Sequence, residues 1–225
     1  SGICANALCG RLTDRVTSFG TSAILTEVPE MFGAETLLMQ RCKNRETFDK
    51  CVDMINSFKQ YFFSHNQECY ENPSPGNHDG GITTLEEKSL GCIQKGGKAI
   101  ITDILKYGEH CKKPGLSLLT GPGNDIVSVT NLTAAGANII LFTTGRGTPL
   151  GAPVPTVKIS SNSSLYRRKS NWIDFNAGEL INNRDFENIT EEILNLVIEV
   201  ASGKKTKNEI NSYRDISIFK DGVIM

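Results

Sequence analysis

The stretch from Asn72 to Ser89 gathers side chains that could do chemistry on a polar ligand. It reads NPSPGNHDGGITTLEEKS, with two prolines that restrict the backbone and three glycines that permit positive φ or a close approach to a ligand. Such a loop can wrap a polyhydroxylated anion, and long polar loops in compact domains are often functional. Four of its residues could supply acid, base or metal-ligand groups: His78, Glu86, Glu87 and Lys88. The alternative is a surface loop before a capped helix, since Thr84 and Glu87 have the spacing of a capping box.

A second candidate is the turn GPGND at 121–125, between an apolar strand and a helix. The N-terminus of a helix offers free N–H groups and a positive dipole end, which suit a carboxylate or a phosphate. Gly123, Asn124 and Asp125 are therefore candidate binding residues. The alternative is a tight turn in which Asn124 or Asp125 only caps the helix. The turn is neither a Walker A loop nor a GxGxxG dinucleotide fingerprint.

Two further segments follow apolar strands. TTGRGTP at 143–149 has Arg146 between two glycines, where it could hold a carboxylate bidentately, with Thr144, Gly145 and Thr148 beside it; a structural salt bridge is the alternative. In EVPEMFGAE at 27–35, Glu27 ends a strand and is a candidate buried carboxylate near a metal. Ordinary helix-start chemistry explains Glu30.

The pattern of apolar residues predicts the elements that position these segments. Apolar runs predict buried strands at 21–28, 116–120, 138–143 and 156–160, and a last strand at 216–219. Spacings of three or four residues predict helices at 44–63, 86–94, 99–107, from the 121–125 turn to about 135, and 188–201. For the last helix, Asn188 with Glu191 resembles a capping box and Gly203 fits the stop. Strand, helix and strand in succession predict parallel pairing through a crossover helix. The expected fold is α/β, a mainly parallel sheet flanked by helices in a Rossmann-like layered architecture.

Composition limits the classes of function. The chain has 225 residues, is 39% hydrophobic and carries a formal net charge of −1, so it has no broad basic field for nucleic acid or an anionic membrane. No apolar run reaches the length of a membrane span, and no signal peptide is visible. The seven cysteines are odd in number and contain no CxxC pair, which disfavours a disulfide scaffold or a zinc ribbon. We expect reduced cysteines in a cytoplasmic protein.

Taken in order, these segments resemble one family, the altronate and galactarate dehydratases. The matching runs are EVPEMFGAE at 27–35, NPSPGN at 72–77, GGITTLEEKSLG at 80–91, GPGND at 121–125 and FTTGRGTPLG at 142–151. The tail resembles the altronate branch in WIDFNAG at 172–178 and ISIFKDGV at 216–223. The resemblance extends over essentially the whole chain.

Full-length members of this family carry a small N-terminal domain and a middle region ahead of the part that this chain resembles. The resemblance therefore implies that residues 1–225 are the C-terminal domain of a sugar-acid dehydratase. It also implies a divalent metal, Fe²⁺ or Mn²⁺, as in related lyases. Glu27 and His78 are the candidate metal ligands here, and the other ligands are expected upstream. His78 stands where many members have Lys.

The implied reaction is β-elimination of water from D-altronate, which gives 2-keto-3-deoxy-D-gluconate in hexuronate catabolism. A base removes the proton next to the carboxylate, an acid helps the 3-hydroxyl to leave, and a cation stabilises the enediolate-like charge. On the resemblance, Arg146 and the 121–125 turn hold the carboxylate. Glu86, Glu87 or Lys88 transfer protons or support the metal, and the general base is unassigned. The residues expected to hold substrate hydroxyls are Asn72, Ser74, Asn77, Thr83 and Thr84.

Three alternatives stay open at this point. The first is a sister activity, galactarate dehydratase or a sulfolactate-type lyase. The second is a non-catalytic fragment that binds a sugar acid without turning it over. The third, a generic nucleotide-binding α/β domain, is disfavoured because neither glycine turn has the required fingerprint. The expected partner is a small anionic sugar acid, with no nucleic acid and no membrane, and the chain could form a homo-oligomer.

Overall fold

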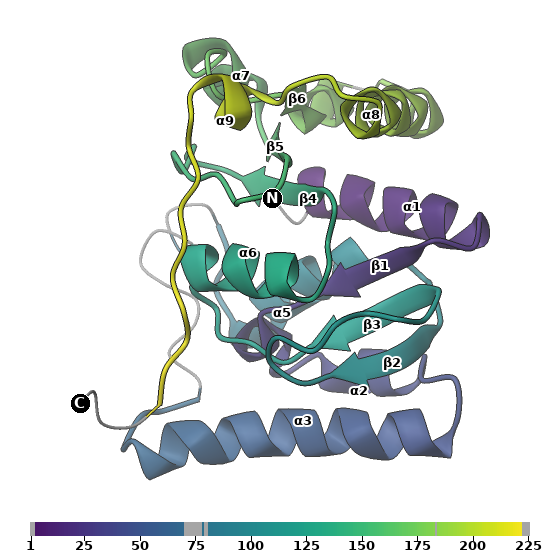
Figure 1. Ribbon diagram of the computed structural model, residues 1–225, viewed down its shortest axis with the longest axis vertical. Coiled ribbons are helices and arrows are strands. Elements are labelled where there is room, and N and C mark those ends of the chain that lie inside the picture. Colours follow the sequence, from purple (N-terminus) through teal and green to yellow (C-terminus); the bar gives the residue numbers. More distant parts are fainter. Residues whose placement is uncertain (1–2, 70–77, 79–80, 183, 222–225) are drawn as a thin grey trace.

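Among the residues that it describes, the computed structural model of the chain has two parallel sheets of three strands each (Figure 1). It describes residues 3–69, 78, 81–182 and 184–221. The strand order is β1-β3-β2 in the first sheet and β4-β5-β6 in the second. The strands are β1 (Ser22–Leu25), β2 (Ile101–Leu105), β3 (Gly115–Leu119), β4 (Ile140–Thr144), β5 (Thr156–Ser160) and β6 (Phe175–Asn176). This arrangement confirms the predicted α/β fold with parallel strands and flanking helices.

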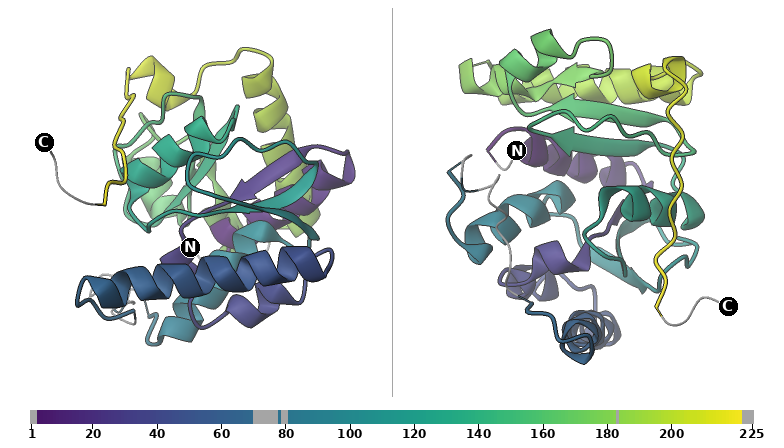
Figure 2. Two further views of the ribbon diagram at one scale, coloured as in Figure 1. Left: turned by 60° about the horizontal axis from the view of Figure 1, so that its bottom comes forward. Right: turned by 90° about the vertical axis from the view of Figure 1, so that its left-hand side faces the viewer.

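Helices cover both sheets, and Figure 2 shows their places from two further directions. In Figure 1, α3 runs along the bottom of the molecule, α8 lies at the top, and α1 and α6 lie at the level between the sheets. The α-helices are α1 (Ala5–Ser18), α2 (Glu35–Met39), α3 (Arg45–Ser64), α5 (Leu85–Ile93), α6 (Asp125–Ala134), α7 (Ser163–Arg168), α8 (Phe186–Ala201) and α9 (Lys207–Ile210). Short 3₁₀ helices are η1 (Val28–Met31), η2 (Gln94–Gly96) and η3 (Ala177–Asn182). No helix of the described part could cross a membrane.

Each sheet has its own hydrophobic core. The first core packs Ile55 of α3 and Leu38 of α2 against Leu118 of β3. In the second, Leu8 of α1 packs with Ile159 of β5, together with residues of α8. Burial of such side chains, at about 25 cal/mol per Å² of apolar surface, is the main term that holds each sheet to its helices.

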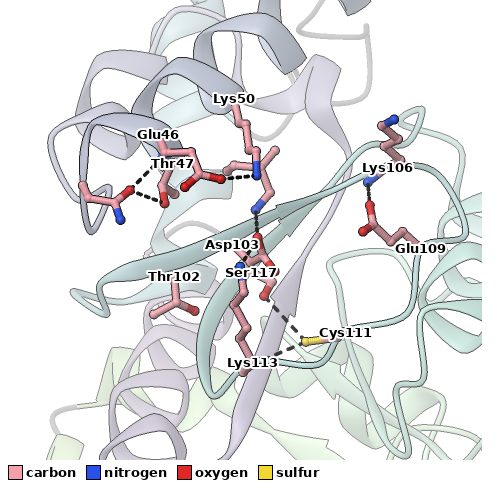
Figure 3. Close-up of polar contacts among 12 residues, drawn as sticks. Glu46, Thr47, Lys50, Thr102, Asp103, Lys106, Glu109, Cys111, Lys113 and Ser117 are labelled. Carbon is pink, nitrogen blue, oxygen red and sulfur yellow. Dashed lines mark hydrogen bonds and ion pairs between the residues drawn. The ribbon is translucent and has the colours of Figure 1, made fainter.

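Polar contacts fix the connection between β2 and β3, as Figure 3 shows. Lys113 Nζ lies 3.0 Å from Asp103 Oδ1, and the Cys111 thiol lies 3.6 Å from Ser117 Oγ. The backbone N–H of Cys111 also donates to the carbonyl of Ala135 at 2.9 Å, just after α6. These contacts hold the connection against β2, β3 and the end of α6.

Local signals predicted several element boundaries correctly. The predicted helix at 44–63 is α3, and Asn44 caps it by accepting from the N–H of Thr47 at 2.9 Å. The strand at 156–160 is β5. Asn124 caps α6, as one of the two expected caps. Gly203 follows α8 with φ 106°, as the stop requires.

Four local predictions were wrong. Residues 99–107 form β2 instead of a helix, because the β-branched run Ile100, Ile101 and Thr102 fits a strand and pairs with β3. Residues 216–219 form no strand and pair with none of the described strands. Helix α8 is capped by Asp185, which accepts from the N–H of Asn188 at 3.1 Å, so Asn188 is not the cap. The strands at 116–120 and 138–143 do not pair with each other, because they belong to different sheets.

Candidate active site

Two hydrogen bonds hold the segments that follow the carboxyl ends of β1 and β3 next to each other. Thr26 Oγ1 donates to the carbonyl of Leu119 at 3.0 Å, and the N–H of Val28 donates to the carbonyl of Gly121 at 3.0 Å. A Cβ atom at Gly121 would lie 2.7 Å from Asn131 Nδ2, so glycine is required for this close approach. The segment after β1 and the 121–125 turn therefore meet at one edge of the sheet, where ligands of α/β proteins bind.

Glu27 stands at this edge in an unusual backbone conformation. Its φ of 72° and ψ of 61° lie in the left-handed region, which costs a non-glycine residue free energy. Its side chain is only 16% exposed, and its Oε2 lies 3.4 Å from Lys95 Nζ. The strained backbone thus directs a carboxylate toward a lysine from η2.

Glu30, one turn further along η1, is the most heavily paired carboxylate of the site. Its Oε1 lies 3.1 Å from Lys88 Nζ of α5, and its Oε2 lies 3.9 Å from Lys95 Nζ. The thiol of Cys92 donates to Glu30 Oε2 at 3.0 Å. We call the set Glu27, Glu30, Lys88, Cys92 and Lys95 the acid–base cluster.

The two carboxyl groups of the cluster have opposite pKa shifts. Burial, and then the negative charge of Glu30, raise the pKa of Glu27 to about 7. Burial also opposes ionisation of Glu30, but the charges of Lys95 and Lys88 outweigh it and lower the pKa of Glu30 to about 2. The two carboxylates in turn raise the pKa of Lys95 against the effect of its burial. Titratable neighbours with divergent pKa values are typical of acid–base catalysis, and Glu27 could exchange a proton near neutral pH.

Asp125 belongs to the same environment. The pKa of Asp125 is raised, first by the protein atoms that surround its carboxyl and then by the charge of Glu30. It is the first residue of α6, next to the cap Asn124, whose Oδ1 accepts from the N–H of Val127 at 3.3 Å. Two of the residues that the sequence singled out, Glu27 and Asp125, are thereby brought near each other.

A cavity of about 650 Å³ ends at this cluster. Glu27, Lys95, Asp125 and Thr143 are among its polar lining residues. A second cavity, of about 10 Å³, lies against Glu27, Glu30, Cys92 and Lys95 and has about the least volume that holds one water. The cluster is therefore shielded from bulk solvent on most sides and open to the larger cavity.

Asn6 links α5, the helix that carries Lys88 and Cys92, to strand β4 of the second sheet. Its Nδ2 donates to the carbonyl of Gly91 in α5 at 2.8 Å, and its Oδ1 accepts from Thr143 Oγ1 of β4 at 2.8 Å. The side chain is buried, so both bonds are shielded from water. The start of α1 thus fixes the carboxyl end of β4 relative to the acid–base cluster.

A buried lysine of β5, Lys158, holds the loop that follows β4 in place. Lys158 Nζ of β5 donates to the carbonyls of Thr148 and of Leu150, the latter at 2.6 Å. Burial lowers the pKa of Lys158 to about 8. The N–H of Gly147 donates to Thr144 Oγ1 at 2.9 Å. These bonds fix the loop that carries Arg146.

Other predicted residues of this loop and of α5 lie on the surface. Arg146 is exposed, and the carbonyl of Gly145 accepts from Asn162 Nδ2 at 3.1 Å. Glu86 is exposed. Glu87 closes a capping box with Thr84, as its alternative interpretation expected.

The remaining predictions concern the long loop. Glu87 Oε2 also accepts from Thr83 Oγ1 at 2.9 Å, so both threonines start α5 together with Glu87. His78 is exposed, and its carbonyl accepts from the N–H of Gly81 at 2.9 Å. Asn72, Ser74 and Asn77 lie outside the described residues, and their substrate-binding roles stay predictions.

The described residues contain no group of three or more His, Cys, Asp or Glu side chains that could hold a metal ion. Glu27 and Glu30 face lysines, and His78 is not grouped with them. The donors of the described part therefore do not by themselves fit the predicted metal.

Several residues of the site could not be identified as functional from the sequence alone. Glu30 has the residue type and position of a helix start, and the only hint to its role was its place inside the run EVPEMFGAE. Lys95 and Cys92 follow the recognised run GGITTLEEKSLG and carry no motif. Asn6 and Lys158 lie among apolar residues, where a single polar residue is the available signal.

The fold and the site define an α/β protein with a buried acid–base cluster at the carboxyl ends of parallel strands. Residues 1–224 match the family described as D-galactarate/Altronate dehydratase, C-terminal. The chain belongs to this family.

Relatives agree with this assignment. Altronate dehydratase of Escherichia coli (strain K12) is 55% identical over 225 residues, which make up 100% of this chain and 46% of that protein. Altronate dehydratase of Bacillus subtilis (strain 168) is 56% identical over 226 residues, again 100% of this chain and 46% of that protein. Galactarate dehydratase (L-threo-forming) of Escherichia coli (strain K12) is 34% identical over 207 residues, or 91% of this chain and 40% of that protein. The chain thus spans about half the length of these relatives.

Proposed function

We propose that this chain is the C-terminal part of a hydro-lyase that dehydrates D-altronate to 2-keto-3-deoxy-D-gluconate. The observation that carries the proposal is the acid–base cluster at the carboxyl ends of β1 and β3, in a chain 55–56% identical to two altronate dehydratases. An elimination needs a group that accepts a proton from carbon and a group that protonates the departing hydroxyl. The cluster offers both in one cavity-lining site.

In this proposal Glu27 is the group that moves a proton. Its carboxyl is neutral or ionised at nearly equal cost near pH 7, because its pKa is about 7. The ammonium group of Lys95, 3.4 Å from Glu27 Oε2, stabilises the ionised carboxylate. As the C2–H bond breaks, Glu27 takes the proton and the electron pair forms the C2–C3 double bond. The C3–O bond breaks as Lys88, the cluster lysine on α5, gives the hydroxyl a proton so that it leaves as water, and the enol becomes the 2-keto acid.

The substrate carboxylate is assigned to the 121–125 turn and Arg146. The first N–H groups of α6 and its dipole favour an anion there. Arg146 follows β4 in a loop that Lys158 fixes, and a guanidinium can bind a carboxylate with two parallel hydrogen bonds. The substrate hydroxyls would bind to the loop that contains Asn72 and Asn77.

Further parts of the proposal rest on the family alone. We infer an enzyme of sugar-acid catabolism, in keeping with the names of its relatives, and a cytoplasmic location, which the odd number of cysteines without a CxxC pair favours. A divalent cation, Fe²⁺ or Mn²⁺, remains part of the proposal, with ligands that include groups outside the described residues. Such a cation would stabilise the enediolate-like charge. A homo-oligomer is also consistent with the proposal.

Galactarate is the second candidate substrate, because a galactarate dehydratase is 34% identical to the chain. The higher identity to altronate dehydratases favours altronate. A fragment that binds a sugar acid without turnover is the alternative from another class. It would bind altronate with the same cluster and release it unchanged.

The test compares two proteins. One is the 225-residue chain, and the other is a chimera that joins it to the part of the Bacillus subtilis altronate dehydratase outside the match. Both are supplied with Fe²⁺ under reducing conditions and with D-altronate, galactarate and sulfolactate in turn. We expect the chimera to form the 2-keto-3-deoxy acid from D-altronate fastest. A chimera that folds and binds D-altronate but yields no product from any of them would contradict the proposal.

A further inference from the structure

The facing edges of β1 and β4 carry backbone groups without a strand partner in the described part of the chain. On β1, the carbonyl of Thr21 accepts from the N–H of Gly115, so the groups of Thr21, and of every second residue after it, face β3. Successive residues of a strand direct their N–H and C=O groups to opposite sides. The N–H and C=O of Ile24 therefore point away from β3, and β1 has no other strand neighbour among these residues.

The edge of β4 has the same property. The N–H of Ile140 donates to the carbonyl of Pro155, and the carbonyl of Thr144 accepts from Ser161, so even-numbered residues face β5. The groups of Leu141 and Thr143 point the other way. Ile24, Leu141 and Thr143 are only partly buried, and strand edges with unpaired N–H and C=O groups are templates for pairing with another strand.

A slot separates these two edges. The 650 Å³ cavity is lined by the unbroken runs 21–27 and 136–143. Side chains alternate between the faces of a sheet, so lining by consecutive residues shows that the cavity meets both strands edge-on. The rest of the lining includes Leu12 and Val16 of α1, and Val129 and Leu132 of α6. Two strand edges and two helices thus enclose the space, which we call the β1–β4 slot.

Helix α1 has the position of a crossover helix for a strand in this slot. Its first turn lies at the carboxyl ends of the second sheet, where the Cys4 thiol donates to the carbonyl of Ser161 at 3.0 Å. Its last turn leads directly into the amino end of β1. In a parallel sheet, a helix that runs back from carboxyl to amino ends connects two parallel strands.

We propose that a mainly apolar β strand fills the β1–β4 slot, parallel to both neighbours, and joins the two sheets into one. Its source is the part of the dehydratase polypeptide that the relatives carry outside the match, which is more than half of their length. The slot's walls are mostly apolar, so a strand fits its body, whereas the substrate fits only the polar end at Glu27 and Asp125. The C-terminal tail of this chain is already engaged, since the N–H of Ser217 donates to Thr130 Oγ1 at 3.0 Å.

The test measures amide hydrogen exchange by NMR. In the 225-residue chain, the amides of Ile24, Leu141 and Thr143 should exchange at least about tenfold faster than those of Leu25 and Phe142, which face their strand neighbours. Overlapping peptides of about 12 residues, long enough for one strand, are then added. They span the part of the Bacillus subtilis altronate dehydratase outside the match. One apolar peptide should bind and slow exchange at all three slot amides by about tenfold.

Proline variants check the geometry. Ile24→Pro removes a slot-facing N–H without removing a hydrogen bond to β3, so the chain should fold and lose at least about tenfold in peptide affinity. Ile24→Val keeps the N–H and should bind as the parent does. Leu141→Pro tests the other edge and replaces Ile24→Pro if that variant does not fold.

Three results would overturn the proposal. Slow exchange of the slot amides in the chain alone would mean that the edges are already paired. Binding of none of the peptides would remove the proposed occupant. Protection that rises with the concentration of the chain, without peptide, would assign the slot to a second copy. None of these results depends on catalytic activity, so the outcome is independent of the proposed dehydration.

Discussion

Opposite charges lie close together and largely shielded from solvent in the acid–base cluster. The side chains of Lys88 and Lys95 are 15% and 25% exposed, and those of Glu27 and Glu30 are 16% and 19% exposed. At such burial, removal of one partner leaves an uncompensated charge, which costs more than the pair contributes. The cluster is therefore sensitive to single substitutions that keep the volume of the side chain.

Lys95→Met should show this sensitivity. The change leaves Glu27 and Glu30 facing each other without a shared cation, so we expect a loss of about 3 kcal/mol in the free energy of unfolding. Urea denaturation measures the loss. Lys98→Met, in the same segment but exposed, should change stability by less than about 0.5 kcal/mol. Equal effects of the two substitutions would show that Lys95 is not part of a buried network.

The pH dependence of the free energy of unfolding tests the raised pKa of Glu27. Its pKa rises from 4.5 to about 7 on folding, so the folded protein binds more protons than the unfolded chain between these values. Its contribution to the free energy of unfolding is therefore lost as pH rises from about 5 to about 7, by up to about 3 kcal/mol. Glu27→Gln should lack this loss. Parallel pH profiles for the parent and Glu27→Gln would refute the raised pKa.

Glu30 contributes with the opposite sign. Its pKa is lowered to about 2, so its contribution is present above the ordinary value of 4.5 and is lost as pH falls toward 2. The two contributions occupy different pH ranges, and the Glu27→Gln comparison above pH 5 is not affected by protonation of Glu30.

Arg146→Lys tests the bidentate carboxylate contact. A lysine keeps the charge but not the planar fork, so kcat/KM of the chimera for D-altronate should fall about tenfold. Arg45→Lys is the matched control, because Arg45 is 84% exposed and pairs with Asp49 within α3. Unchanged kinetics of Arg146→Lys would remove Arg146 from the substrate carboxylate.

For single residues, the sequence predicted where a side chain lies in the fold better than it predicted which side chains it contacts. Glu27 could be predicted because an acidic residue directly after an apolar strand lies at a sheet edge. Lys95 could not, because it reaches Glu27 only through the packing of η2 on α1. A Cβ atom at Gly97 would lie 2.3 Å from the carbonyl oxygen of Gly10, 87 residues earlier, and no local pattern encodes such an approach.

Among the elements, the turn between β3 and α6 allows the backbone of Gly121 to approach Asn131 of α6 closely. Gly121→Ala would place a Cβ atom 2.7 Å from Asn131 Nδ2, so we expect a loss of about 1 to 3 kcal/mol in stability. Gly123→Ala is the control in the same turn. Its Cβ atom would meet only Glu30 Cγ, at 3.9 Å, and its stability should change by less than about 0.5 kcal/mol. Thermal unfolding compares the two, and an equal shift in Tm would contradict the close approach at Gly121.

Elements with strong local signals were predictable, whereas those that depend on pairing were not. Helix α3 has both an apolar stripe and a cap, and its bounds agree with the prediction within one residue. The segment 99–107 has apolar spacing that suits a helix, but its β-branched residues gain more from pairing with β3. The run at 216–219 has the composition of a strand but pairs with no described strand, because the N–H of Ser217 donates to Thr130 Oγ1 of α6 instead.

For the whole molecule, the two sheets share the acid–base cluster at their junction. The cluster combines residues that directly follow β1 with residues of α5 and η2, and Glu27 and Lys95 line the slot that separates the sheets. A strand in the slot would place its carboxyl end between Glu27 and Thr143. The proposed site and the proposed strand are thus neighbours, although their tests are separate. The sequence predicted the parallel α/β class but not the division into two sheets, because pairing between distant strands has no local signal.

The most direct measurement is the turnover of D-altronate by the chimera with Glu27→Gln. Gln keeps the size and hydrogen bonding of the side chain but cannot accept the proton, so kcat should fall at least about 100-fold while KM changes little. Lys98→Met should retain the activity of the parent. A Glu27→Gln chimera that forms the 2-keto-3-deoxy acid within about twofold of the parent rate would contradict the assignment of the acid–base cluster as the reaction centre.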